Sequence, residues 1–420
     1  MERMLQYIWK HRLFSEPDFV TTTGELVVVI DPGISNHDAG PDFFNAKIRI
    51  GNTVWVGNIE IHNRSTDWRH HQHQHDKLYD TVILHIVRYH DAEIFRTNGE
   101  PIPQAILTVP EKIEKNIEWL LSRDRPVSCA ERMTMVSPVH LSGWLSALLI
   151  ERLERKTTDI FVRLKNNFKD WNEVFYVTLM RNFGFGVNSD AFELLAGSLP
   201  YKVILKHRHN AVQIEALFFG QAGLLDDEME DTYYALLKRE YHFLRKKYQL
   251  RPVDSYLFKK LRIRPGNFPY IRLSQIATVW VKHDLLFSKT LEADSLKTVR
   301  SFFNVEPSDY WLTHYRFNTS SEIKKKSIGQ SATDIILINT IIPILFAYGK
   351  QTDRPDLCEK ALRWLDEIKP EKNSIVALYS KSGISIKNAG DTQALIQLRR
   401  EYCDRKKCLY CRIGLKLIKN

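Results

Sequence analysis

Strand-like and helix-like patterns occupy different parts of this chain. Alternating or unbroken apolar runs of strand length are confined to the first ~110 residues. From Val139 onward, apolar residues recur at helical spacing in long runs that Gly, Pro and Asn interrupt. No repeat period is sustained, which argues against a solenoid. The 420 residues suffice for two separate cores. We therefore predict an α/β domain over residues 1–125 and a larger, irregular all-α domain over residues 126–420.

The N-terminal pattern predicts a helix, three strands, a second helix and a further strand. The helices are expected at 4–13 and 69–79, and the strands at 25–30, 43–50, 53–62 and 82–87, with 92–96 pairing against the last. Such an order gives a mixed sheet.

The second domain is predicted to be built from amphipathic helices. These are expected at 140–165, 171–183, 191–207, 211–224, 230–248, 273–287, 295–303, 332–348, 355–365 and 392–403. The most apolar window, 335–348, is shorter than a membrane span and contains Asn339 and Pro343. We interpret it as a buried helix and expect no membrane association.

Charge is divided unevenly along the chain. Residues 1–136 hold 15 Lys and Arg against 19 Asp and Glu, a net charge of −4, and the remainder holds 45 against 31, a net charge of +14. A basic body beside a mildly acidic domain suits a phosphate-rich partner, although a basic surface also serves solubility alone. Five cysteines and the lack of an apolar N-terminal signal lead us to expect a reducing, cytoplasmic environment.

Acid, base and metal-ligand residues are concentrated near the start of the chain. Eight of the 15 histidines lie in residues 37–90. Asp42 and Glu60 fall on successive predicted strands, where two carboxylates would form an oxygen-rich site for Mg²⁺ or Mn²⁺, completed by the Ile61 carbonyl. His62 follows Glu60 by two residues and therefore shares its strand face. Such a cation polarises a phosphodiester and activates water.

Pro41-Asp42 followed by Glu60-Ile61-His62 resembles the PD-(D/E)XK motif of restriction-endonuclease-like nucleases, and the predicted element order is similar to the core of that superfamily. The resemblance covers about the first quarter of the chain. It implies a metal-dependent nuclease acting on DNA, with Asp42 and Glu60 as metal ligands. His62 stands where the family usually has Lys, and it would position or deprotonate the attacking water.

RecB-like members of that superfamily carry Gln-x-x-x-Tyr in the next helix, and this chain has His75 and Tyr79 at that spacing. The resemblance implies that these two residues assist catalysis. On a helix His71 would share their face, and Glu2 in the first helix would add an acid. The segments 40–42, 57–62 and 65–68, together with the histidines, are also similar to an uncharacterised bacterial family of unknown function over nearly the whole chain.

Three other interpretations use the same residues. A nuclease scaffold that has lost catalysis would bind nucleic acid only, for which His62 in the Lys position is the main argument. An interaction protein would need neither nucleic acid nor catalysis, with Asp42 and Glu60 in a turn and a surface ion pair. A zinc hydrolase would use His71, His73 and His75, although Asp76 follows His75 where the similar zinc motif has it before.

Two features lie outside this region. Cys403, Cys408 and Cys411 have the spacing C-x₄-C-x₂-C, and Cys129 or Cys358 would supply a fourth ligand to Zn²⁺ or an iron–sulfur cluster. The likeness to RecB-like nucleases, some of which use a cluster to join distant parts of the chain, favours Cys129, although the cysteine order differs. Free buried thiols are the alternative. The segment 259–272 mixes basic and aromatic residues, which suits nucleic-acid contacts or a packed turn equally.

Overall fold

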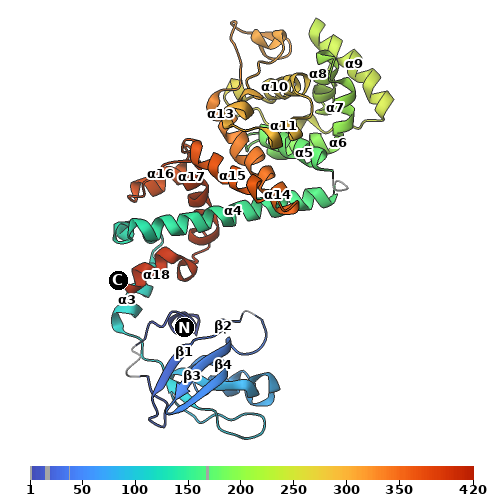
Figure 1. Cartoon of the computed structure of the whole chain (residues 1–420). Coiled ribbons are helices and arrows are strands. Elements are labelled where there is room, and N and C mark those ends of the chain that lie inside the picture. The colour runs from blue at the N-terminus through green and yellow to red at the C-terminus, as the bar shows by residue number, and fades with distance from the viewer. Residues whose placement is uncertain (1, 15–18, 37, 167–169) are drawn as a thin grey trace. The chain divides into compact units, whose positions relative to one another are not determined.

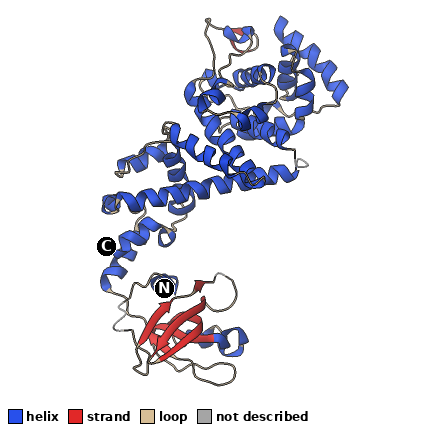
Figure 2. Ribbon diagram, viewed as in Figure 1, coloured by secondary structure: helices blue, strands red, loops and turns tan. Residues whose placement is uncertain are grey.

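The computed structural model describes residues 2–14, 19–36, 38–166 and 170–420, and the chain forms two compact units (Figure 1). Unit 1 comprises residues 1–141 together with 399–420, and unit 2 comprises residues 142–398. The mixed-sheet domain is therefore N-terminal and the region after it is mostly helical, as predicted (Figure 2). The C-terminal segment, which the sequence placed with the helical domain, instead belongs to the same unit as the sheet.

Unit 1 is built on one mixed sheet with the order β1-β3-β4-β5-β6, and β2 pairs with β3. The strands are β1 Val27–Asp31, β2 Ile34–Ser35, β3 Phe43–Ile50, β4 Thr53–Arg64, β5 Val82–Tyr89 and β6 Gln104–Ile106. The helices are α1 Glu2–Lys10, α2 Asp67–His70, α3 Glu111–Ser122 and α18 Arg412–Lys419. β1, β3 and β4 are antiparallel, whereas β5 runs parallel to β4 and β6 parallel to β5.

Two predictions about this sheet were wrong in detail. The segment 92–96 contributes only an isolated bridge between Phe95 and Pro101, and β6 is the strand that pairs with β5. The other is the regular alternation that a strand over 43–50 implies, because Phe43 and Ala46 are both buried although they are three residues apart. Asn45 has a φ of 54° and forms a bulge opposite β4, which shifts the alternation by one residue.

Gly57 explains how closely β4 approaches the start of β5. A Cβ at Gly57 would overlap the side chain of Ile83 and lie 2.9 Å from the carbonyl oxygen of Thr81. This strand position therefore has no room for a side chain, despite the preference of strands for β-branched residues.

Unit 2 is helical, apart from a small hairpin of β7 His314–Arg316 and β8 Thr319–Ser320. It begins within the long helix α4 Pro138–Asn166. The others are α5 Trp171–Phe183, α6 Ser189–Ser198, α7 Tyr201–His207, α8 Ala211–Gln221, α9 Thr232–Tyr248, α10 Pro269–Lys282, α11 Leu286–Glu292, α12 Leu296–Ser301, α13 Gln330–Ile336, α14 Ile342–Gln351, α15 Pro355–Glu367, α16 Ser374–Lys381 and α17 Ala389–Gln397. Most lie where the helical pattern placed them. The predicted helix 191–207 is divided at Pro200, which cannot donate a backbone hydrogen bond.

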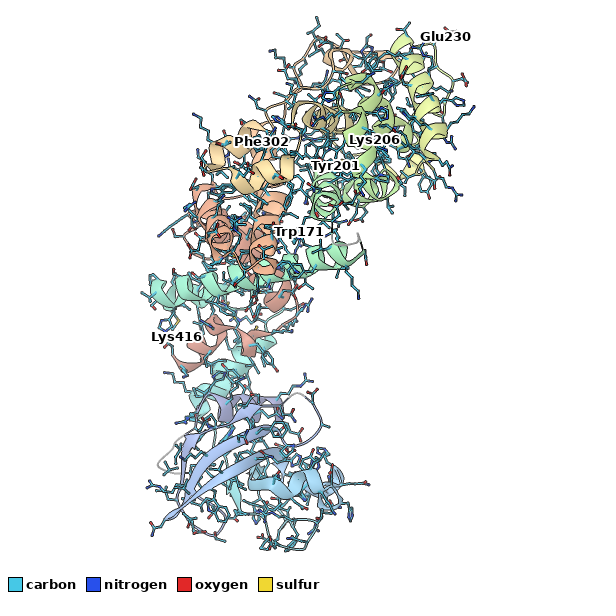
Figure 3. All side chains as sticks on the ribbon, turned by 45° about the vertical axis from the view of Figure 1, so that its right-hand side comes forward. Trp171, Tyr201, Lys206, Glu230, Phe302 and Lys416 are labelled. Atoms are coloured by element: carbon cyan, nitrogen blue, oxygen red, sulfur yellow. The ribbon has the colours of Figure 1, made fainter. Side chains whose placement is uncertain are left out.

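Large side chains fill the space between these helices (Figure 3). Trp171 stacks on Phe287 with ring centroids 6.1 Å apart, and the Tyr201 ring lies 5.1 Å from that of Trp280. Such aromatic pairs supply much of the buried apolar surface that stabilises a helical core.

Among the described residues, one helical stretch, Gln330–Gln351, is long and apolar enough to cross a membrane. Within its most apolar window, 72% of the residues are buried inside the protein. Nine of its apolar side chains belong to the main hydrophobic core of unit 2: Ile336, Leu337, Ile338, Ile341, Ile342, Ile344, Leu345, Phe346 and Ala347. The stretch is therefore a core helix of this unit, as its sequence indicated.

Candidate metal centre

Asp42, which immediately precedes β3, and Glu60, which lies in β4, are side by side at the end of this hairpin away from its turn. The Asp42 N–H donates a hydrogen bond to Glu60 Oε2 (3.0 Å), and the Ile61 N–H donates to Asp42 Oδ2 (3.0 Å). Gln6 of α1 donates from Nε2 to Asp42 Oδ1 at 2.7 Å. The antiparallel pairing of Phe43 with Ile59 sets this arrangement. The structure thus brings together the two carboxylates that the sequence singled out.

Both carboxyl groups keep their protons to a higher pH than exposed carboxyl groups do. Burial, followed by the charge of Glu60, raises the pKa of Asp42 to about 7. Burial, with a contribution from the charge of Glu2, raises the pKa of Glu60 to about 8. The negative charge of Glu2 therefore raises the pKa of both carboxyl groups. A divalent cation would reverse these effects because it favours ionised ligands.

The histidine-rich segment is not the continuous helix predicted over 69–79. Helix α2 ends at His70, and Gln72 then adopts the left-handed conformation with φ 61°. Two short 3₁₀ segments follow, at His73–His75 and Lys77–Thr81. A left-handed backbone is unusual for a residue other than glycine, and such strain is often found at functional sites.

This break decides which histidines turn inward. His73 is buried, and the Tyr79 ring stacks on it with a centroid distance of 3.7 Å. His75 is exposed, so the predicted shared face of His71, His75 and Tyr79 is not formed. For the same reason the zinc set of His71, His73 and His75 is not assembled. Tyr79 remains beside the carboxylates, since burial and then the charge of Glu60 raise its pKa to about 12.

The histidine that joins His71 and His73 is His62 of β4, not His75. In the part of the chain that the structure describes, the group of metal-ligating side chains whose donor atoms all lie within 4.8 Å of one another is His62, His71 and His73. His62 Nε2 is 3.0 Å from His71 Nδ1 and 3.4 Å from Glu60 Oε1. His73 Nε2 is 3.5 Å from the same Glu60 oxygen and is buried without a hydrogen-bond partner.

These separations fit a metal ion. Ligands placed tetrahedrally at 2.0–2.1 Å from an ion lie about 3.4 Å from each other. Glu60 Oε1 and the three imidazole nitrogens have the donor types of transition-metal sites, and imidazole favours Mn²⁺ or Zn²⁺ over Mg²⁺. His71 is exposed, which leaves this side of the cluster open to solvent. The arrangement can therefore hold a cation that a solute can reach.

A buried hydrogen-bond chain sets the tautomer of His62. Gln104 of β6 donates from Nε2 to the Ala92 carbonyl oxygen (2.9 Å), so its Oε1 faces His85 Nδ1 at 3.2 Å and must accept. His85 Nε2 then accepts from His62 Nδ1 at 2.9 Å. The lone pair of His62 is consequently on Nε2, which faces Glu60 and His71. Partners of this kind orient metal ligands in many proteins.

We expect Gln104→Leu to weaken metal binding because it leaves His85 Nδ1 without its acceptor. His62 is then no longer held in the tautomer whose lone pair is on Nε2. The loss in affinity should be about 10- to 100-fold, as for other residues that orient ligands. Gln104→Glu, which keeps an oxygen facing His85, should retain most of the affinity. Mn²⁺ titration of each variant, beside its metal-free unfolding curve, separates orientation from a general loss of stability. Equal losses in both variants would contradict the tautomer argument.

The cysteines and the segment 259–272, which the sequence also singled out, lie outside this cluster. Cys129, Cys403, Cys408 and Cys411 line one cavity, whereas Cys358 lies on α15 in unit 2. In the segment 259–272 the basic residues up to Arg264 are exposed, but Tyr270 and Arg272 are buried. The Arg272 guanidinium lies 4.0 Å from the centre of the Phe185 ring. The aromatic end of the segment is therefore a packed turn.

Residues 2–374 match the family described as "Protein of unknown function (DUF2851)". The chain belongs to this family. No curated protein and no solved structure matches the chain significantly. Membership of the DUF2851 family agrees with the whole-chain resemblance noted in the sequence, and it names no activity.

Proposed function

We propose that this protein is a divalent-metal-dependent nuclease that hydrolyses phosphodiester bonds in DNA. The observation that carries the proposal is the convergence of Glu60 Oε1, His62 Nε2 and His73 Nε2, with His71 on the solvent side and Asp42 hydrogen-bonded to Glu60. A bound cation would polarise the phosphodiester and lower the pKa of a water molecule. We favour Mn²⁺ over Mg²⁺ because of the three imidazoles.

The proposed roles follow from the surroundings of each side chain. Glu60, His62 and His73 hold the cation from the buried side, and Asp42 fixes the carboxylate of Glu60 through its backbone N–H. Tyr79 holds the ring of His73 in place by stacking. His71, being exposed, is placed to meet the substrate.

We further propose that unit 1 is a restriction-endonuclease-like domain. The order of its elements supports this: helix α1, the antiparallel strands β1, β3 and β4, a helical segment, and then β5 parallel to β4. Asp42 immediately precedes β3 and Glu60 lies within β4, the order in which the similar nuclease motif has its two acids.

Charge supports a nucleic-acid substrate. The segment 399–420 contains eight Lys and Arg against two Asp and Glu, and it belongs to unit 1 with the candidate site. Lys259, Lys260, Arg262 and Arg264 add an exposed basic loop in unit 2. Such residues bind phosphates without regard to sequence.

The test is direct. Purified full-length protein is incubated with labelled single- and double-stranded DNA, and with RNA, in Mn²⁺, Mg²⁺, Zn²⁺ or EDTA. We expect cleavage of DNA with Mn²⁺ and none with EDTA or with Glu60→Gln. Salt-sensitive DNA binding without cleavage in any metal would overturn the nuclease proposal.

We expect Mn²⁺ affinity to rise with pH between 6.5 and 8. Binding requires ionised carboxylates, and the pKa values of Asp42 and Glu60 are about 7 and 8 in the metal-free protein. In this window the metal-free folded state holds protons that the unfolded chain has lost, so its stability falls as pH rises. Bound Mn²⁺ stabilises the ionised carboxylates and so removes this fall in stability. Calorimetry in buffers of different ionisation enthalpy should show protons released on binding near pH 6.5, and Asp42→Asn should release fewer. Binding without proton release would contradict the expectation.

One observation favours a non-catalytic nucleic-acid-binding protein as the second candidate. His62 stands in the Lys position of the motif, and burial, together with His85, lowers its pKa to about 2. It therefore brings no positive charge to a phosphate at neutral pH. Metal binding without DNA cleavage would be the result expected of this candidate.

A further inference from the structure

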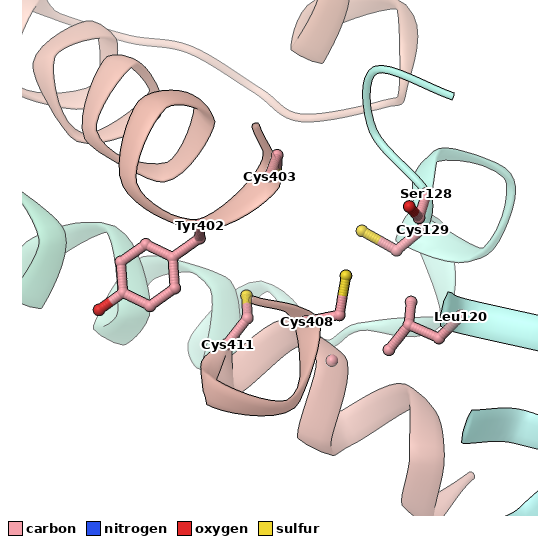
Figure 4. A pocket seen from close by; sticks show the side chains of 8 residues that line it. Leu120, Ser128, Cys129, Tyr402, Cys403, Cys408 and Cys411 are labelled. Carbon is pink, nitrogen blue, oxygen red and sulfur yellow. The ribbon is translucent and has the colours of Figure 1, made fainter. Parts of the chain in front are cut away.

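Four of the five cysteines meet in unit 1, although 273 residues lie between Cys129 and Cys403 along the chain. Cys129, Cys403, Cys408 and Cys411 line one cavity together with Leu120, Ser128, Tyr402 and Gly414 (Figure 4). None of them forms a disulfide.

Each cysteine lies at the end of a short element. Cys129 precedes the 3₁₀ segment Ala130–Met135, and Cys403 closes a π-helical turn that starts at Leu398. Cys408 begins another 3₁₀ turn, and Cys411 precedes α18. Helix ends and turns, rather than helix faces, supply the four thiols.

The surrounding contacts hold the two chain segments together around the cavity. Asn116 donates from Nδ2 to the Ile418 carbonyl oxygen at 3.1 Å, Arg399 donates to the Pro126 carbonyl oxygen, and Lys406 pairs with Asp124 at 3.3 Å. Gly414 has no room for a Cβ, which would overlap the Cys408 carbonyl oxygen. The tight turn at Cys408 is thus built into the packing of α18.

From this cluster we infer that Cys129, Cys403, Cys408 and Cys411 bind a thiolate-ligated metal centre that fastens the C-terminal segment to unit 1. Inert packing of thiols accounts less well for the convergence of four cysteines from two distant segments on one cavity. The inference is independent of the proposed nuclease activity.

The spacing of the sulfur atoms favours an iron–sulfur cluster over one zinc ion. Sulfurs bound at 2.3 Å around a tetrahedral Zn²⁺ lie about 3.8 Å apart. Among the described residues, no three of the cysteine sulfurs lie within 4.8 Å of one another, as the histidine group does. A cluster, in which each thiolate binds a different iron, accommodates a wider spacing.

The experiment is metal analysis of tag-free, full-length protein purified without oxygen. We expect iron and inorganic sulfide in equal amounts and absorption in the visible range. Cys129→Ser and Cys408→Ser should each lower the metal content at least tenfold, whereas Cys358→Ser, the matched control outside the cavity, should keep it. Limited proteolysis should cut the 404–407 turn faster in the first two variants. Circular dichroism verifies that each variant is folded.

The alternative outcomes are distinct. One zinc per chain that depends on the same cysteines would support the four-thiolate site and overturn its assignment to a cluster. Protein without bound metal, or a folded Cys129→Ser variant with undiminished metal, would overturn the site itself.

Discussion

Replacing Glu60 by Gln should abolish Mn²⁺-dependent DNA cleavage. The substitution keeps the size of the side chain and an oxygen for the Asp42 N–H, but it removes the charge and the ligand atom that face His62 and His73. A catalytic cation contributes several kcal/mol to transition-state stabilisation, which corresponds to a fall in rate of about 1,000-fold. Cleavage rates at saturating Mn²⁺ measure the effect.

The same variant should be at least as stable as the wild type when metal is absent. Burial raises the pKa of Glu60 to about 8, so near pH 8 the folded state bears the cost of ionising a buried group next to Asp42. The neutral amide carries no such cost. A loss of activity together with unchanged or higher thermal stability would distinguish a functional site from a structural one.

His75→Ala is the matched control for this experiment. His75 belongs to the same histidine-rich segment but is exposed and lies outside the cluster, so its removal should change cleavage by less than about twofold. His73→Ala should behave like Glu60→Gln because His73 is buried in the cluster. Cleavage that survives in Glu60→Gln, or that is lost equally in His75→Ala, would contradict the proposed site.

The second large effect concerns folding. Gly220 lies in α8, where alanine should stabilise a helix by about 1 kcal/mol on intrinsic propensity. A Cβ at this position would overlap the ring of Tyr241 in α9. The ring cannot move aside because its hydroxyl donates to Gln221 Oε1 at 2.9 Å in the core. We therefore expect Gly220→Ala to destabilise unit 2 by about 3 kcal/mol.

Gly197→Ala provides the comparison. Gly197 lies in α6, is exposed, and has no atom within 4 Å of the position of a Cβ. It should follow propensity and raise stability by up to about 1 kcal/mol. Urea unfolding of both variants, followed by tryptophan fluorescence, gives the two shifts. Similar shifts in the two variants would mean that α8 and α9 pack less closely than described.

Local patterns were sufficient for most of the secondary structure. The helical runs of unit 2 lie close to their predicted positions because each helix displays its apolar face at its own 3.6-residue period. The pairing of β3 with β4 followed from two short strands joined at Gly51. It was also enough to bring Asp42 near Glu60 and to put His62 on the same face. These are contacts between close neighbours in sequence.

Contacts across the fold were beyond such patterns. The left-handed turn at Gln72 buries His73 and leaves His75 exposed. A helical spacing of polar residues does not reveal that one of them will adopt a left-handed conformation. His85 stands within an apolar strand, and its role depends on Gln104 in β6, which pairs with that strand only in three dimensions. Gln6 reaches Asp42 from a different element.

The sequence by itself determined most of the element types, the pairing of the strands predicted at 43–50 and 53–62, and the closeness of the carboxylate pair, because these depend on periodicity and on short loops. Only the tertiary structure decided which histidines join the carboxylates and that residues 399–420 return to unit 1. Those choices depend on the packing of side chains from distant segments, and that packing leaves no period in the chain.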